Sequence, residues 1–212
     1  MNRTGVLIVI SGFSGAGKGT LMKRLMECYD NYALSISMTT RAPRPGEENG
    51  VHYFFVDKET FEKTIAEDGL IEYASYCGNY YGTPRAYVEN CLSEGKDVIL
   101  EIEIQGACKI REKYPDAVLV FVTPPDGAEL EKRLSGRGTE TDEVIRTRLQ
   151  RAIEEAEGIE NYDYIVVNDE LDRCMEDIHA IVRAAGCRMK ESVSRIESIS
   201  DELSSYLKGE KE

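Results

Sequence analysis

The chain has no tryptophan, only two histidines, and no pair of cysteines spaced as C-x-x-C. Structural zinc sites are built from closely spaced cysteine and histidine ligands, so we expect neither a zinc site nor a redox centre. Scattered cysteines of this kind usually behave as small buried thiols in a reducing compartment. The six cysteines are Cys28, Cys77, Cys91, Cys108, Cys174 and Cys187.

Long apolar runs are also missing. The longest, Val6–Ile10, is far shorter than the roughly 20 residues that a membrane-spanning helix needs. A glycine-rich loop follows this run, where a secretory signal would have a cleavage site. We therefore expect a cytoplasmic protein with no membrane partner.

Basic residues are outnumbered, with 26 Lys and Arg against 39 Asp and Glu, and the formal net charge is −13. Such a chain repels the phosphate backbone of nucleic acids, so we expect no nucleic-acid partner. A few convergent arginines can still bind one small phosphate compound. The hydrophobic content of 42% over 212 residues is sufficient for one soluble globular domain.

Apolar segments alternate with amphipathic ones, and this alternation favours an α/β fold with a parallel sheet. The uniformly apolar Val6–Ile10 is typical of a strand that is buried on both faces. The other predicted strands are Val98–Ile104, Ala117–Val122 and Tyr164–Asn168. The predicted helices between them are Thr83–Glu94, Gly106–Lys113, Gly127–Leu134 and Thr141–Glu157.

Two segments interrupt this alternation, and a tail follows it. Residues 37–81 predict an inserted substrate lobe of short strands with one helix, and residues 135–141, which contain Gly and Arg, predict a mobile flap. After residue 171 the chain is mostly helical, with a break near Gly186. The apolar stripe of this tail favours packing against its own domain over a dimer seam. The stripe consists of Ile196, Ile199, Leu203 and Leu207.

The strongest local pattern is G-x-x-x-x-G-K, placed between the first predicted strand and a helix. Its glycines let consecutive backbone N–H groups turn inward around an anion, and the positive end of the helix points at the same place. Lys18 adds a point charge for the β- and γ-phosphates. The pattern predicts that a nucleoside triphosphate is bound by Gly12, Phe13, Ser14, Gly15, Ala16, Gly17, Lys18, Gly19 and Thr20.

One position of this loop departs from the common pattern. Gly19 stands where a Ser or Thr hydroxyl normally contacts magnesium, and Thr20 comes one residue later. The order G-K-G-T resembles the loop of adenylate kinase. We therefore expect the Mg²⁺ that accompanies ATP to be held mainly through water and by acids elsewhere.

Two arginines, Arg41 and Arg44, lie in the segment T-T-R-A-P-R-P-G-E, where prolines restrict the backbone. Guanidinium groups fixed in this way suit bidentate binding of a phosphate. The blocks G-N-Y-Y-G-T, from Gly78, and S-G-R-G-T-E-T, from Ser135, come later. In this order and spacing the blocks resemble the guanylate kinase family, from about Val6 to His179.

The resemblance implies ATP-dependent phosphorylation of GMP, and of dGMP, to the diphosphate in purine metabolism. It implies a P-loop kinase core of about five parallel strands flanked by helices (residues 1–36, 84–126 and 158–190), an inserted mixed GMP-binding lobe (37–83), a small lid (127–157) and a C-terminal helical tail (187–212). Contacts to the acceptor phosphate are implied for Arg41, Arg44, Tyr53 and Tyr81. Contacts to guanine are implied for Ser37, Glu72, Thr83 and Glu103.

For Glu72 the residue type itself supports a role in base recognition. Guanine presents N1–H and N2–H₂ as adjacent donors, which a buried carboxylate accepts well. Adenine would leave that carboxylate desolvated and unpaired.

A second departure lies in the predicted strand Val98–Ile104, where the family typically has aspartates instead of Glu101 and Glu103. Alternation along the strand puts both side chains on one face, at the end where parallel sheets bind ligands. Glu101 would then lie near Mg²⁺, through water, and Glu103 near the guanine amino group.

The transfer step needs positioned cations more than covalent chemistry, and no general base, because the attacking phosphate oxygen is already anionic. Arg137 lies between two glycines, a flexible setting for a side chain that moves on closure. The resemblance supports Arg137 and Arg148 as the arginines that stabilise the transition state. The predicted catalytic residues are Lys18, Arg41, Arg137 and Arg148, with Arg133 and Arg137 also contacting ATP.

Two alternative functions remain. Gly19 and Glu103 motivate a nucleoside monophosphate kinase of altered base preference, although Glu72 and Ser37 argue against it. Some domains of this kind are non-catalytic interaction modules, although these should have a degraded phosphate loop. The sequence does not distinguish a monomer from a homo-oligomer.

Overall fold

Five parallel strands form the central sheet of the computed structural model, which describes residues 4–76, 78–136, 142–188 and 193–208. The strand order is β2-β7-β1-β8-β9, with every neighbouring pair parallel. The predicted α/β class is thereby confirmed. The strands are β1 (Leu7–Gly12), β2 (Tyr32–Leu34), β7 (Asp97–Glu101), β8 (Val118–Thr123) and β9 (Tyr164–Val167).

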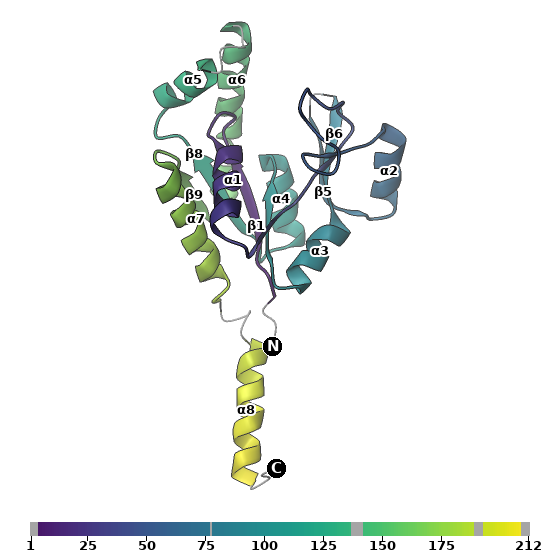
Figure 1. Ribbon diagram of the computed structural model, residues 1–212, viewed down its shortest axis with the longest axis vertical. Coiled ribbons are helices and arrows are strands. Elements are labelled where there is room, and N and C mark those ends of the chain that lie inside the picture. Colours follow the sequence, from purple (N-terminus) through teal and green to yellow (C-terminus); the bar gives the residue numbers. More distant parts are fainter. Residues whose placement is uncertain (1–3, 77, 137–141, 189–192, 209–212) are drawn as a thin grey trace.

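Helices cover both faces of this sheet (Figure 1). On one face lie α1 (Lys18–Cys28) and α7 (Leu171–Ala185), and on the other lie α3 (Arg85–Ser93) and α4 (Ile104–Lys113). Because successive strand residues point to opposite faces, Ile8 and Ile10 join the core under α1 and α7, while Leu7 and Val9 join the core under α3 and α4. Burial on both faces explains why this strand is apolar throughout.

A second, mixed sheet with the order β4-β3-β6-β5 forms the lobe inserted between β2 and β7. Strands β3 and β4 pair in parallel, and the other pairs are antiparallel. The helix of this lobe, α2, begins after Asp57, whose side chain accepts a hydrogen bond from the Thr60 N–H. The elements are β3 (Met38–Thr39), β4 (Phe54–Phe55), α2 (Lys58–Ala66), β5 (Leu70–Tyr76) and β6 (Asn79–Pro84).

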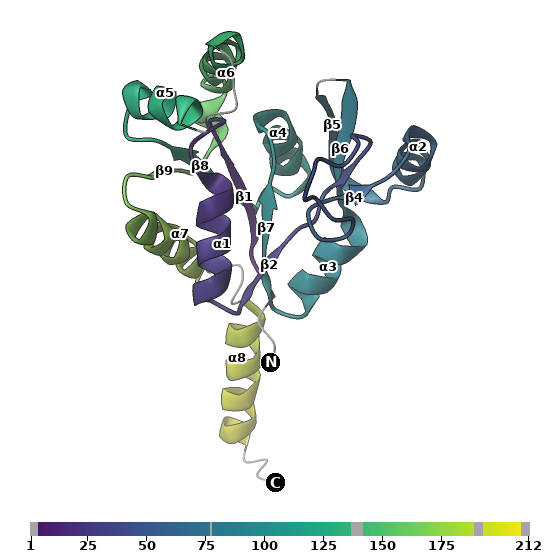
Figure 2. The same ribbon diagram turned by 45° about the horizontal axis from the view of Figure 1, so that its top comes forward.

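Two further helices, α5 (Gly127–Ser135) and α6 (Asp142–Glu155), lie beyond the carboxyl end of β8 (Figures 1 and 2). They share a small apolar cluster in which Leu134 and Ala152 pack with Phe13 of the predicted phosphate loop. The side chains of this helical pair therefore rest directly on that loop. A short 3-10 helix (Ile159–Asn161) connects α6 to β9.

Some predicted boundaries were wrong. The strand predicted over Val98–Ile104 ends at Glu101, and Glu103 is instead the residue that precedes the first turn of α4. The helix predicted from Thr83 begins at Arg85, because Thr83 and Pro84 still belong to β6. The helix predicted from Gly106 begins at Ile104.

The tail forms a separate helix, α8 (Val193–Lys208), which extends away from the rest of the molecule in both views (Figures 1 and 2). All four side chains of its apolar stripe are exposed, up to 90% for Leu207. The expectation that this stripe packs against its own domain was therefore wrong. Within the part of the chain that the structure describes, no helix has the length and apolarity to cross a membrane.

Candidate active site

The predicted phosphate loop connects β1 to α1, and two of its glycines are required by the geometry. A Cβ atom on Gly12 would lie 2.0 Å from the Val122 carbonyl oxygen of the neighbouring strand. Gly17, directly before α1, has a φ of 90°, in the left-handed region that side chains rarely adopt. The loop therefore turns tightly at the carboxyl edge of the sheet. The N-terminus of α1 points into the space that the loop surrounds.

Lys18 is the cation of this loop. Its Nζ donates hydrogen bonds to the carbonyl oxygens of Gly12 (2.7 Å) and Phe13 (3.2 Å). The ammonium group is thus held over the loop by the loop's own backbone. Its position fits the predicted role as a point charge for the phosphates.

The far side of the loop is braced by a residue that the sequence did not indicate. Asn168, which is buried, donates from Nδ2 to the Ala16 carbonyl oxygen at 2.8 Å. Arg133 donates to the same oxygen (3.3 Å) and to the Asn168 carbonyl oxygen (2.9 Å). Arg133, predicted to contact ATP, therefore supports the loop backbone in this structure. Asn168 follows β9 at the carboxyl edge of the sheet, and that position was the available signal.

In the inserted lobe, Arg41 forms a bidentate ion pair with Glu47, at 2.9 and 3.0 Å. Glu47 also accepts from the Arg44 backbone N–H, and its pKa is lowered by Arg41 first and by this N–H second. The Arg41 guanidinium lies 5.3 Å from the centre of the Tyr53 ring. Glu47 was not singled out from the sequence, although it ends the quoted R-P-G-E block.

The other residues predicted for the acceptor phosphate lie nearby. The rings of Tyr53 and Tyr81 are 6.2 Å apart, and burial raises the pKa of Tyr53. Tyr81 lies opposite Thr39 on β3, and the Ser37 carbonyl oxygen accepts from Phe54 N–H. Arg44 has an exposed side chain. The lobe thus brings Arg41 and both tyrosines together and leaves Arg44 at its margin.

Glu72 is the most deeply buried acid of the lobe, with 4% of its surface exposed. Thr83, its partner across β5 and β6, donates to Oε1 at 2.6 Å. Burial raises the pKa of Glu72, and Thr83, Lys109 and Lys113 offset part of that rise. A Cβ atom on Gly106 would lie 3.0 Å from Oε2, so the glycine leaves room for the carboxylate. Glu72 is therefore a buried carboxylate whose Oε1 is already hydrogen-bonded to Thr83.

Glu101 and Glu103 both lie at the carboxyl edge, although only Glu101 belongs to β7. Burial raises the pKa of Glu101, Lys18 lowers it and Glu103 raises it further. The side chain nevertheless keeps exposed surface. We interpret this as a carboxyl group with protein on most sides and one open side.

The predicted transition-state arginines are described only in part. Arg137 lies outside the described residues. Arg148 is partly buried on α6, two turns before Glu155, whose carboxylate accepts a hydrogen bond from the Ser14 N–H at 3.2 Å. Within the described ranges, no three His, Cys, Asp or Glu side chains are grouped so that they could hold a metal by themselves.

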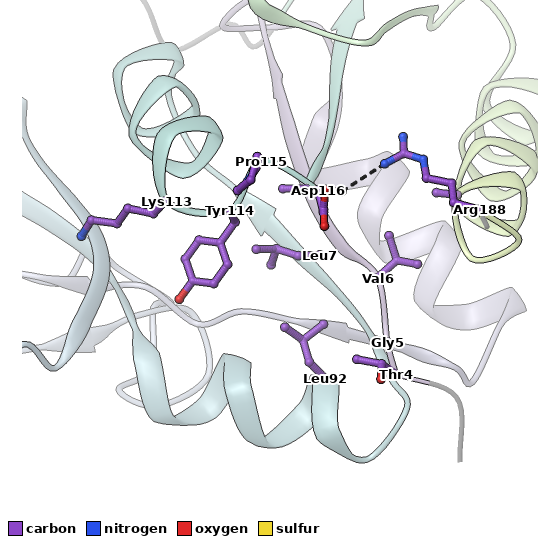
Figure 3. A pocket seen from close by; sticks show the side chains of 12 residues that line it. Thr4, Gly5, Val6, Leu7, Leu92, Lys113, Tyr114, Pro115, Asp116 and Arg188 are labelled. Atoms are coloured by element: carbon purple, nitrogen blue, oxygen red, sulfur yellow. Dashed lines mark hydrogen bonds between the residues drawn. The ribbon is translucent and has the colours of Figure 1, made fainter. Parts of the chain in front are cut away.

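A separate hollow of about 240 Å³ lies at the opposite end of the sheet (Figure 3). Its lining includes Leu7, Leu92 and Tyr114, and Arg188 beside it donates to the Asp116 carbonyl oxygen. None of the predicted site residues lines this hollow. Parallel sheets bind ligands at the carboxyl ends of their strands, so we place the active site at the phosphate loop instead.

Comparison with known proteins gives one consistent result. The sequence model of the family described as "Guanylate kinase" matches residues 4–185. The chain is 49% identical to the guanylate kinase of Latilactobacillus sakei, over 92% of this chain and 97% of that protein. It is 50% identical to the guanylate kinase of Desulfitobacterium hafniense, over 88% and 93%. The crystal structure of guanylate kinase from Anaplasma phagocytophilum superposes with a TM-score of 0.73 at 34% identity, over 88% of this chain and 89% of that one.

Proposed function

The chain belongs to the guanylate kinase family and catalyses ATP-dependent phosphorylation of GMP to GDP, and we propose that it does so with the residues gathered at the carboxyl edge of the central sheet. The observation that carries this assignment is the buried Glu72 carboxylate, oriented by Thr83 at 2.6 Å. The Thr83 hydroxyl donates to Glu72 Oε1, and Oε2 remains to accept hydrogen bonds from guanine N1–H and N2–H₂. We propose dGMP as a second acceptor.

The acceptor phosphate binds to Arg41, Tyr53 and Tyr81, with Arg44 closing from the margin. The bidentate contact from Glu47 supports this assignment, because it fixes the Arg41 guanidinium beside the Tyr53 ring. Ser37 and Glu103 complete the proposed GMP contacts. The arginine is thus oriented before the substrate arrives, which reduces the entropic cost of binding.

The donor triphosphate binds to the loop from Gly12 to Thr20, with Lys18 on its β- and γ-phosphates. The brace from Asn168 and Arg133 supports this, because it holds the Ala16 carbonyl oxygen on the far side of the loop and so fixes the loop backbone. Arg148 and Arg137 are the proposed clamps on the charge that moves during transfer.

Magnesium is the proposed cofactor, and the available ligands fit a water-mediated site. Gly19 supplies no hydroxyl, and Glu101 is an acid at the carboxyl edge whose pKa Lys18 lowers against the effect of burial. When bound with ATP, Mg²⁺ would neutralise charge on the β- and γ-phosphates. Mg²⁺ commonly keeps several waters and uses one or two carboxylates, which agrees with the absence of a denser acidic group among the described residues.

The protein contributes mainly alignment to the chemical step. An oxygen of the GMP phosphate attacks the γ-phosphorus in line, the bond to the ADP oxygen breaks, and no proton has to be removed. The inserted lobe holds the acceptor, the loop holds the donor, and α6 carries a cation to the region between them.

The test is a coupled assay of ADP release with ATP and each of GMP, dGMP, IMP, AMP, CMP and UMP. We expect rapid turnover with GMP and dGMP, and AMP turnover that is lower by several orders of magnitude, as expected when a buried acceptor is left unpaired. Comparable rates with AMP or UMP would refute the role of Glu72. A folded protein that turns over none of them would be an interaction module.

A further inference from the structure

The last residue of α6 makes a contact that the transfer mechanism above does not use. The Glu155 carboxylate accepts from the Ser14 N–H, at 3.2 Å and across 141 residues of sequence. The apolar cluster that joins Ala152 and Leu149 of α6 to Phe13 lies next to this contact. The end of α6 is therefore held against the phosphate loop by packing as well as by a hydrogen bond.

The Glu155 carboxylate accepts from a phosphate-loop N–H and lies near two cations, Lys18 and Arg151. Burial and the nearby Glu103 raise the pKa of Glu155, whereas the Ser14 N–H, Lys18 and Arg151 lower it. Lys18 and the loop N–H are also groups to which we assign the phosphates. A carboxylate that interacts with these two groups competes with the triphosphate for the same positive charge and the same hydrogen-bond donor.

Glu155 also has a second potential partner. The Tyr162 hydroxyl is buried and makes no hydrogen bond with the described residues. Burial raises the pKa of Tyr162, the Ser11 side chain beside the hydroxyl lowers it, and Cys108, Glu103 and Glu155 raise it by smaller amounts. The Ser11 hydroxyl donates its own hydrogen to the Ile102 carbonyl oxygen. A buried hydroxyl without a partner is costly, and an approaching carboxylate would satisfy it.

We propose that Glu155 is a displaceable stand-in for a phosphate of ATP: it accepts from the Ser14 N–H until the triphosphate takes that donor, and it then accepts from the Tyr162 hydroxyl. Glu155 and Arg148 are seven residues apart on α6, which places them on the same side of the helix, about two turns apart. Displacement of the carboxylate shifts α6, and Arg148 moves with the helix. Glu155 is thus a positioning residue that couples ATP arrival to the placement of the clamp.

This inference rests on the proposed function only in taking ATP as the donor, so the test measures ATP binding without an acceptor. The dissociation constant for Mg·ATP is measured by calorimetry on the full chain, together with KM for ATP and kcat. The variants are Glu155→Gln, Glu155→Ala and Tyr162→Phe, and the control is Glu154→Gln, whose side chain is exposed one residue away. Failure of GMP specificity would leave these binding results unchanged.

We expect Glu155→Gln and Glu155→Ala to tighten ATP binding about three- to tenfold, because a neutral or missing side chain competes less for the N–H. Both variants should lower kcat, because Arg148 is no longer coupled to ATP. Glu154→Gln should leave both values within about twofold. Unchanged or weaker ATP binding in both Glu155 variants would overturn the proposal.

Tyr162→Phe tests the second position. It should weaken ATP binding about threefold by removing the partner of the displaced carboxylate, and the fold should tolerate it, because the lost hydroxyl has no hydrogen bond here. In the Glu155→Ala background the same change should have no further effect. An equal effect of Tyr162→Phe in both backgrounds would overturn the coupling between the two residues.

Discussion

Thr83 and Glu72 face each other across two antiparallel strands and share a 2.6 Å hydrogen bond in which the hydroxyl donates to Oε1. Both side chains are buried, so this bond fixes which carboxylate oxygen remains available. The specificity of the site therefore depends on a pair of residues rather than on Glu72 alone.

Replacing Glu72 by Gln should abolish most recognition of GMP. Thr83 would still donate to the amide oxygen, so the amide NH₂ would take the place of Oε2 and meet the donors of guanine. We expect kcat/KM for GMP to fall by about 100-fold or more, with KM for ATP nearly unchanged. Steady-state kinetics measure both values. Glu59→Gln, an exposed change on α2, is the control and should have no effect.

The same substitution should change how stability depends on pH. Burial raises the pKa of Glu72 above its ordinary 4.5, so the folded state binds the proton more tightly than the unfolded state does. The stability that protonated Glu72 contributes to the wild type is therefore fully present below the ordinary pKa of 4.5. It is lost as the pH rises through the pKa of the folded state. Glutamine does not titrate.

We therefore expect Glu72→Gln to be more stable than the wild type at pH 7.5 and to lose that advantage towards pH 4.5. Each unit of pKa shift corresponds to about 1.4 kcal/mol at the upper end of this window. Urea denaturation at a series of pH values measures the difference. A difference that is constant with pH, or that grows towards acid, would contradict the buried-carboxyl interpretation.

Gly106 should be needed for the position of the same carboxylate. An added Cβ would lie 3.0 Å from Glu72 Oε2 and 3.2 Å from Ile102 Cδ1, so one of them has to move. We expect Gly106→Ala to raise KM for GMP about tenfold and to leave KM for ATP within about twofold. Gly127→Ala at the start of α5, where a Cβ meets nothing within 4 Å, is the matched control. Equal effects of Gly106→Ala and Gly127→Ala on KM for GMP would mean that the contact with Glu72 is not the cause.

The parts of the molecule that were predictable from sequence are those with local causes. The loop from Gly12 to Lys18 follows from a spacing of glycines, and the strand β1 before it follows from an uninterrupted apolar run. The three-residue strand β2 was missed because so short a segment has no measurable period. Glu101 and Glu103 alternate like strand residues, yet the chain turns into α4 between them, and a two-residue period does not show where a strand ends.

Two of the residues that the sequence did not indicate act across long distances along the chain. Glu155 reaches Ser14 over 141 residues, and Asn168 reaches Ala16 over 152. No local pattern encodes such contacts, because they exist only after the sheet brings the segments together. The stripe on α8 shows the converse limit: its period predicted the helix correctly but not the surface that would cover it.

Gly19 provides a test of how the loop handles magnesium. A Cβ at Gly19 would meet nothing within 4 Å, so a serine fits in the first turn of α1 without displacing any described atom. Serine also favours a helix over glycine by about 0.5 kcal/mol, so Gly19→Ser should fold at least as well as the wild type. Its hydroxyl would offer the direct ligand that the present loop lacks.

We expect Gly19→Ser to lower the Mg²⁺ concentration for half-maximal activity by about threefold or more, since one water-mediated contact is replaced by a direct one. Gly19→Ala is the matched control, because it adds the same Cβ without an oxygen and should leave the magnesium dependence unchanged. Titration of activity with Mg²⁺ at saturating ATP and GMP separates the two. If alanine and serine shift the curve equally, the effect comes from the backbone of α1, and magnesium is held without any contribution from this position.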